Sequence, residues 1–211
     1  MKNLEFIYKR HSIRKFTEEE VKEEDLKAIM EAAIQAPSGK HRQNWHFVIV
    51  KNKEKIEGIA KLIEEKNKKI ADKLPDKEWA DGFKKFVKYA TIFRTAPVLV
   101  IVYAGDYIPT GLKEFKAIGA SQEEIDALNK ANPGLQGVSA AIENLMISAG
   151  ELGYGTCWMT SPNYAAKEIS EYVNFNKEGY YLAALTPLGV PATEGKSPER
   201  KPLEEVITVI E

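Results

Sequence analysis

The chain has little cysteine: among its 211 residues the only thiol is Cys157. One thiol excludes an intrachain disulfide framework, and zinc sites built from cysteine need several thiolates at close spacing. The three histidines, His11, His41 and His46, do not have the spacing of metal ligands either, and each is interpreted as a loop or interface residue. We therefore expect a reducing compartment and, beside Trp158, a structural cysteine.

Long apolar runs and an excess of charge of one sign are also missing. No window approaches the roughly 20 apolar residues of a membrane helix, and charge appears too early for a signal peptide. The 30 basic and 31 acidic residues leave a net charge of −1, so no overall field favours nucleic acid or a membrane surface. These absences predict a cytoplasmic protein with neither partner, in which local cations hold any bound anion.

The length fits one domain, which we take as residues 1–211. Thr17 and Glu20 have capping-box spacing ahead of a helix whose apolar positions run from Leu26 to Ile34. Further helices are predicted over 4–8, 56–74, 79–93, 122–129, 138–152 and 165–173. Strands are predicted over 47–50, 98–103 and 180–185, and residues 153–159 are predicted to form a Gly-rich turn leading to a short strand. Helices and strands mix without strict alternation, which favours an α+β fold.

Three segments have unusual composition. Residues 106–134 are polar and interrupted by Gly and Pro, and a connection of this length predicts an insertion or lid. The helix over 138–152 is apolar nearly all round, which fits either a central core helix or a dimer seam. The dense Lys and Glu of 51–88 indicate a solvated helical face.

Four loops carry side chains suited to binding. Residues 10–14 (Arg-His-Ser-Ile-Arg) combine two guanidinium groups and a hydroxyl, which suits a phosphate, although an ordinary basic loop has the same composition. Residues 37–45 offer hydroxyls and amides to a planar heterocycle or a polyol, or form a turn anchored by a buried Trp. Residues 153–162 combine close-approach glycines with hydroxyls at Thr160 and Ser161. The basic pair Arg200 and Lys201 indicates a binding site only in combination with the other three loops.

Several other site types are excluded by pattern. Gly153-x-Gly155 lacks the third glycine and the β-α-β frame of a dinucleotide fingerprint. The sequence contains neither the Gly-x-Ser-x-Gly nucleophile elbow nor a P-loop.

In combination, these loops resemble the FMN-dependent nitroreductase superfamily over nearly the whole chain. Each motif is short, but five occur in the family's order and spacing. They are Arg10-x-Ser12-x-Arg14-x-Phe16; Ala36-Pro37-Ser38 with Gln43 and Trp45; Gly153-x-Gly155-Thr156-Cys157-Trp158; Pro187-x-Gly189-x-Pro191; and Arg200-Lys201-Pro202-Leu203.

The resemblance implies an intertwined homodimer with a central mixed or antiparallel sheet flanked by helices, and two FMN sites at the subunit interface. The 138–152 helix would belong to that interface. Arg10, Ser12, Arg14 and Arg200 would hold the phosphate and ribityl region, and the Pro37 loop would come from the partner. The expected cofactor-binding residues are Arg10, His11, Ser12, Arg14, Pro37, Ser38, Gln43, Thr160, Ser161, Pro187, Gly189 and Arg200.

The implied activity passes electrons from NADH or NADPH through FMN to a small acceptor such as a nitroaromatic or a quinone, with the flavin carrying the chemistry. Ala36-Pro37-Ser38-Gly39-x-His41 and Thr160-Ser161-Pro162-Asn163 are similar to the iodotyrosine deiodinase branch. In that branch a hydroxyl before the proline donates toward flavin N5, so Ser161 is the expected tuning residue. Reductive dehalogenation and flavin binding without turnover remain alternatives.

Two departures from the family patterns bear on this reading. Common nitroreductases have Asn-x-Gln-Pro-Trp where this chain has His41-x-Gln43-Asn44-Trp45. The deiodinase substrate clamp needs Glu, Tyr and Lys before the 98–103 strand. Glu64, Glu65 and Lys85 are present there, but no tyrosine lies at helical spacing from the glutamates. Deiodination of a tyrosine substrate is therefore not expected.

Overall fold

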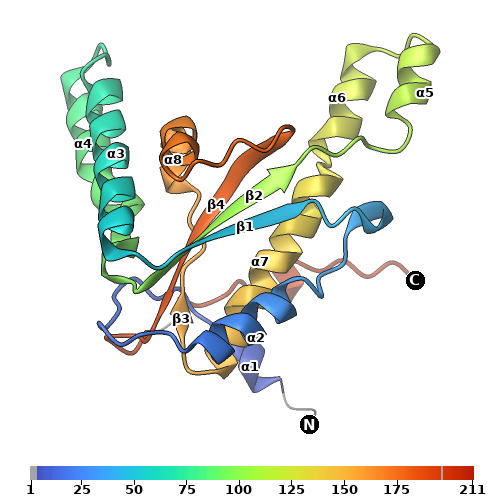
Figure 1. The fold of residues 1–211 in the computed structure, drawn as a ribbon. Helices are drawn as coiled ribbons and strands as arrows, with labels where there is room; N and C mark the ends of the chain where they lie inside the picture. Colours follow the sequence, from blue (N-terminus) through green and yellow to red (C-terminus); the bar gives the residue numbers. More distant parts are fainter. Residues whose placement is uncertain (1–3, 196) are drawn as a thin grey trace.

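A four-stranded antiparallel sheet forms the centre of the computed structural model, which describes residues 4–195 and 197–211 (Figure 1). The strand order is β1-β2-β4-β3, so β1 and β3 form opposite edges. The strands are β1 (Trp45–Val50), β2 (Val98–Gly105), β3 (Gly155–Thr156) and β4 (Tyr180–Gly189). Strand β2 is buried along its whole length, as a strand covered on both faces must be, which explains its continuous apolar sequence.

Helices cover both faces of this sheet (Figure 1). The α-helices are α1 (Glu5–Lys9), α2 (Glu23–Ala33), α3 (Lys53–Ala71), α4 (Lys77–Ala90), α5 (Leu112–Ala117), α6 (Gln122–Lys130), α7 (Pro133–Glu151) and α8 (Ala166–Tyr172). The short 3₁₀ helices of the described residues are η1 (Gly39–His41), η2 (Ile92–Thr95), η3 (Ser161–Ala165) and η4 (Leu203–Glu205). None of the helices in the described ranges is long and apolar enough to cross a membrane.

The alternation of β2 side chains divides the interior into two cores. Val98, Val100 and Val102 pack with α2 and α7 on one face. Leu99 and Ile101 pack with α3, α4 and α8 on the other. Successive residues of a strand point to opposite faces, so one continuous apolar run supplies both cores.

Helix α7 is a core helix. Its buried side chains include Val138, Ile142, Leu145 and Met146, which all belong to the core shared with α2 and β2. This settles one of the two roles predicted for the helix; its part in a dimer seam stays a prediction.

Residues 106–132, which we call the arm, form a helical hairpin. Helices α5 and α6 project beyond the end of the sheet (Figure 1). Ser121 and Glu124 form a capping box at the start of α6, close to the helix predicted over 122–129. The predicted lid ran two residues further, but Pro133 and Gly134 open α7, where proline suits the first helical turn.

The capping box predicted at Thr17 and Glu20 is wrong. Helix α2 begins at Glu23 after Lys22, without a side-chain cap. The main-chain N–H of Thr17 instead donates to the Val190 carbonyl at 2.9 Å, so this segment is extended and pairs with the chain around Val190. The acidic first turn of α2 supplies negative charge at the positive end of the helix dipole.

His46 on β1 gives the fold a defined sensitivity to acid. Its ring packs against Phe175, with centroids 4.8 Å apart, and against Tyr180. Burial, and secondarily the Lys177 charge, lower the pKa of His46 below its ordinary 6.5. The fold therefore favours the neutral ring, and this contribution is complete above pH 6.5 and is lost as the pH falls through the lowered pKa.

We predict that the wild-type chain loses free energy of unfolding relative to His46→Phe as the pH falls from 8 to about 5.5, because only the wild type must protonate a ring disfavoured by the fold. Urea denaturation at each pH measures the difference. In Lys177→Met the loss should be smaller, since that charge no longer lowers the pKa of His46. Parallel stability curves for wild type and His46→Phe would contradict the assignment.

Candidate functional site

The first motif lies against the third. The main-chain N–H of Ile13 donates to the Thr156 carbonyl at 2.8 Å, and Ser12 pairs with Thr156 in a parallel bridge. A Cβ on Gly155 would lie 2.5 Å from Cγ1 of Ile13, so this approach requires glycine. The glycine of the third motif is thus explained by the passage of the first motif across it.

The fourth motif also contacts the first. Phe16 pairs with Pro191 in an antiparallel bridge. A Cβ on Gly189 would lie 2.5 Å from Cδ of Pro97 and 3.3 Å from Cδ1 of Phe16. Pro187 and Gly189 themselves are buried within β4, and their predicted contact with the cofactor stays a prediction.

Two guanidinium groups and a hydroxyl influence the pKa of Cys157. Burial raises the pKa of the Cys157 thiol, while the Arg14 charge, a hydrogen bond from Ser12 and the Arg10 charge act in the opposite direction. These three groups therefore lie within interaction distance of the same sulfur. We call Arg10, Ser12 and Arg14 the cationic cluster; its chemistry suits a phosphate monoester.

The members of the cluster differ in their constraints. The Arg10 side chain is 19% exposed, and its Nε lies 3.4 Å from a carboxylate oxygen of Glu143 on α7. Arg14 is exposed and donates only to the Ser12 carbonyl, at 3.3 Å, among the interactions described. Glu143 was not recognised from the sequence; its one signal was a charged residue within an otherwise apolar stretch of helix.

The segment before the C-terminus returns to the cluster, but Arg200 is not joined to it. The Ser197 hydroxyl donates to the Arg10 carbonyl at 3.3 Å, and Gly195 packs against the His11 ring. Arg200 is exposed and donates to the Pro198 carbonyl. Three residues span at most about 10 Å, which keeps Arg200 near Ser197. Its predicted role at the phosphate stays a prediction, as does that of His11.

The second motif forms a strained, exposed loop around η1. Lys40, His41 and Gln43 have φ angles of 53°, 52° and 45°, the left-handed region that favours glycine. Each such residue costs of order 1–3 kcal/mol, and such residues cluster at functional sites. The Ser38 hydroxyl holds the loop by accepting from the Gln43 main chain at 3.0 Å. Pro37 is exposed at its start.

One chain does not bring the second motif to the cationic cluster. The loop of residues 37–44 leads into β1 at one edge of the sheet, while residues 10–16 border β3 at the other. Three strand spacings separate these edges, roughly 14 Å. This separation is the arrangement expected if the loop serves a site on a second subunit.

The proposed N5 donor lies beyond β3. Met159 and Leu185 exchange two main-chain hydrogen bonds of 2.9 Å, after which the chain turns through Thr160 into η3. Ser161 is half-buried, and within the described residues its hydroxyl makes no hydrogen bond, so it is available to a ligand. Asn163 anchors the turn by donating to the Ala183 carbonyl at 2.8 Å.

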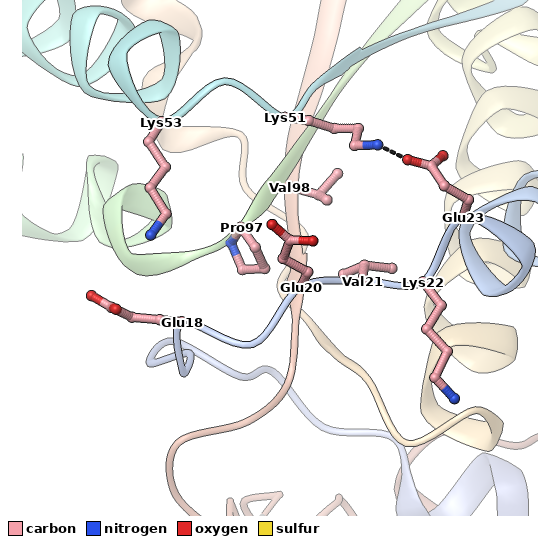
Figure 2. Close-up of a pocket in the computed structure, with 9 residues that line it drawn as sticks. All are labelled: Glu18, Glu20, Val21, Lys22, Glu23, Lys51, Lys53, Pro97 and Val98. Carbon is pink, nitrogen blue, oxygen red and sulfur yellow. Dashed lines mark ion pairs between the residues drawn. The ribbon is translucent and has the colours of Figure 1, made fainter.

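A different cavity, of about 340 Å³, lies away from all of these residues. Figure 2 shows it between the segment before α2, the end of β1 and the start of β2. Its charged lining comprises Glu18, Glu20, Glu23, Lys22, Lys51 and Lys53. Glu23 and Lys51 form an ion pair, and three carboxylates balance three ammonium groups. The described residues include no His, Cys, Asp and Glu group that could hold a metal, so we interpret the cavity as a solvated cleft.

The chain belongs to the Nitroreductase family, whose model matches residues 7–190. It is 45% identical to a BluB-like flavoprotein from Clostridium difficile 630, with a TM-score of 0.92 and complete coverage of both chains. A nitroreductase with bound FMN from Desulfitobacterium hafniense DCB-2 is 26% identical, with a TM-score of 0.69 and complete coverage of both. Iodotyrosine deiodinase of Thermotoga neapolitana is 28% identical over 188 residues, covering 87% of this chain and 85% of the relative.

These comparisons confirm the superfamily resemblance and the α+β fold with an antiparallel sheet flanked by helices. The intertwined homodimer is a property of two chains and stays a prediction.

We predict that Cys157 reacts at least about 100-fold more slowly with a thiol reagent in the native chain than in guanidinium, because burial both hides the thiol and raises its pKa. Release of the chromophore from a disulfide reagent measures both rates. Rapid native labelling would mean that the cationic cluster activates this thiol, and the structural interpretation would be wrong.

Proposed function

We propose that this chain binds FMN and uses it to pass electrons from NADH or NADPH to a small organic acceptor. The observation that carries the proposal is that Arg10, Ser12 and Arg14 share the segment that pairs with β3, and all three act on the pKa of Cys157. A flavin phosphate carries up to two negative charges, and hydrogen bonds between guanidinium groups and phosphate are among the strongest in proteins. Family membership and the FMN bound by the Desulfitobacterium relative support the choice of this phosphate.

The complete site would need two subunits. The cationic cluster of one chain would hold the phosphate, and Pro37, Ser38 and Gln43 of the partner would contact the ring system. The support is the position of these groups at opposite edges of one sheet. In a homodimer with two equivalent sites, the cationic cluster and the loop of each chain would both contact a cofactor.

The bound flavin would supply reversible hydride and electron transfer. The protein's own contribution is binding and orientation. Ser161, whose hydroxyl has no other partner in the described residues, would donate a hydrogen bond at N5 and so favour electron density there. No side chain is required as a general acid or base, and nitroaromatics and quinones are the acceptors expected.

A second candidate activity is reductive dehalogenation. The deiodinase relative and the placement of Ser161 before Pro162 favour it. We do not expect the substrate clamp of the deiodinases here, because Glu64 is held by Arg94, with 2.6 Å between Oε1 and Nη1. This hydrogen bond is the main cause that lowers the pKa of Glu64. A halogenated phenol without an amino acid group is therefore a better candidate than iodotyrosine.

We predict that purified protein is yellow and that NADH or NADPH bleaches its flavin absorbance without oxygen. An anaerobic screen of nitroaromatics, quinones and halophenols with both nicotinamides then separates the candidates. Turnover of nitroaromatics or quinones supports the main proposal, and halide release supports the second. If the protein binds FMN stoichiometrically but oxidises neither nicotinamide, the result supports a flavin-binding protein without turnover. Protein that ignores added FMN would overturn the proposal.

Mixed dimers test whether each site draws on two chains. One variant carries Arg10→Ala and Arg14→Ala, and the other carries Ser38→Ala and Gln43→Ala. Losing charge-assisted hydrogen bonds should weaken FMN binding about 10- to 100-fold in the first homodimer. A heterodimer purified through two different tags should bind one FMN at wild-type affinity, because one of its two sites retains every contact.

The control is a heterodimer of each variant with wild type, which also keeps one intact site. If instead all contacts came from one chain, the mixed dimer of the two variants would have no intact site and would bind FMN no better than its parents.

A further inference from the structure

One buried side chain holds both ends of the arm. Asn44 is 5% exposed and lies between the loop of the second motif and β1. Its side-chain amide donates to the Gly105 carbonyl at 2.7 Å and to the Gly134 carbonyl at 3.4 Å. Its main-chain carbonyl accepts from the Gly105 N–H at 2.6 Å. Gly105 is the residue before the arm and Gly134 is the second residue after it, so a single side chain joins the two.

Tyr107, near the start of the arm, fills the space between the loop and α7. A Cβ on Gly39 would lie 2.6 Å from the Tyr107 hydroxyl, and a Cβ on Gly134 would lie 2.5 Å from its Cβ. The Lys40 ammonium lies 5.8 Å from the centre of the ring. The arm therefore contacts the loop directly. A side chain at position 134 would meet the Tyr107 Cβ, and one at position 39 would displace the end of the Tyr107 ring.

The loop at this contact is the strained one. Gln43, immediately before Asn44, has a φ of 45°, and Lys40 and His41 share the left-handed region. Such conformations persist only where the surroundings determine them, and the Asn44 hydrogen bonds and the Tyr107 packing are part of those surroundings. A shift at either end of the arm must therefore shift the main chain that carries Gln43.

We propose that Asn44 is a positioning residue that couples the arm to the flavin-facing loop, so that the position of the arm sets the position of Ser38 and Gln43. Where common nitroreductases have a proline, this chain has an amide that donates to the two carbonyls flanking the arm. An acceptor bound against the arm alters, through Asn44, how the loop meets the cofactor. The effect on the cofactor rests on the proposed function; the coupling of arm and loop does not.

Hydrogen–deuterium exchange on the flavin-free protein tests the coupling, with Asn44→Asp as the variant. Aspartate keeps the shape but presents a carboxylate to two carbonyl oxygens. Exchange in residues 37–43 and in 105–109 should accelerate together, at least about fivefold, as expected when buried hydrogen bonds become unsatisfied. FMN affinity should fall by a similar factor, and the KM for the acceptor should change more than kcat.

Asn67→Asp is the matched control. Asn67 is 2% exposed and donates to the Phe83 carbonyl at 2.9 Å, so it is an equally buried amide that joins α3 to α4. Its replacement should accelerate exchange in those helices and leave the arm, the loop and FMN affinity within about twofold of wild type. Gly39→Ala gives a second perturbation from the loop side, which displaces Tyr107 without touching Asn44, should Asn44→Asp fail to fold.

Each outcome is decisive. Acceleration of only the arm or only the loop, or equal effects of Asn67→Asp on both, overturns the coupling. Paired acceleration with unchanged FMN affinity overturns the positioning role. A wild-type chain that binds no FMN refutes the proposed function alone, because the exchange comparison is made without flavin.

Discussion

The hydrogen bond between the Ile13 N–H and the Thr156 carbonyl is the constraint on which the candidate site depends. It holds residues 10–16 beside the short edge strand β3, and from this segment Arg10, Ser12 and Arg14 all act on the pKa of Cys157. The glycines of the third and fourth motifs follow from it, since Gly155 and Gly189 leave room for Ile13 and Phe16. The glycines of two motifs far apart in sequence thus have the same steric cause, the passage of the first motif beside them.

Much of this fold could be predicted from local patterns. The β-branched run that became β2 and the apolar helix α7 were both identified, because burial on two faces leaves a strong hydrophobic signal. The Thr17 cap failed because the main chain of that residue is used in long-range pairing with Val190, which no local pattern records. Tertiary pairing overrode the local propensity of Thr17.

The functional details were harder to predict. No turn motif in the sequence predicts positive φ angles at Lys40 and His41. The strain of the loop therefore becomes evident only from its surroundings in the structure. In the sequence Asn44 stands out only as a departure from a family pattern, because its two carbonyl partners lie 61 and 90 residues away. Residue types indicated the phosphate chemistry, but the partners of Arg10 and Asn44 required coordinates.

If the cationic cluster and the loop of residues 37–44 are halves of different sites, their position at opposite edges of the sheet has a thermodynamic consequence. If a cofactor is held only where two chains meet, cofactor binding and subunit association are thermodynamically linked. Binding of the cofactor then stabilises the dimer, and dimerisation raises the affinity for the cofactor. An isolated subunit would have only partial affinity, so dilution would release flavin and flavin depletion would promote dissociation. Cellular flavin supply would then act on the quaternary state of the protein as well as on its turnover.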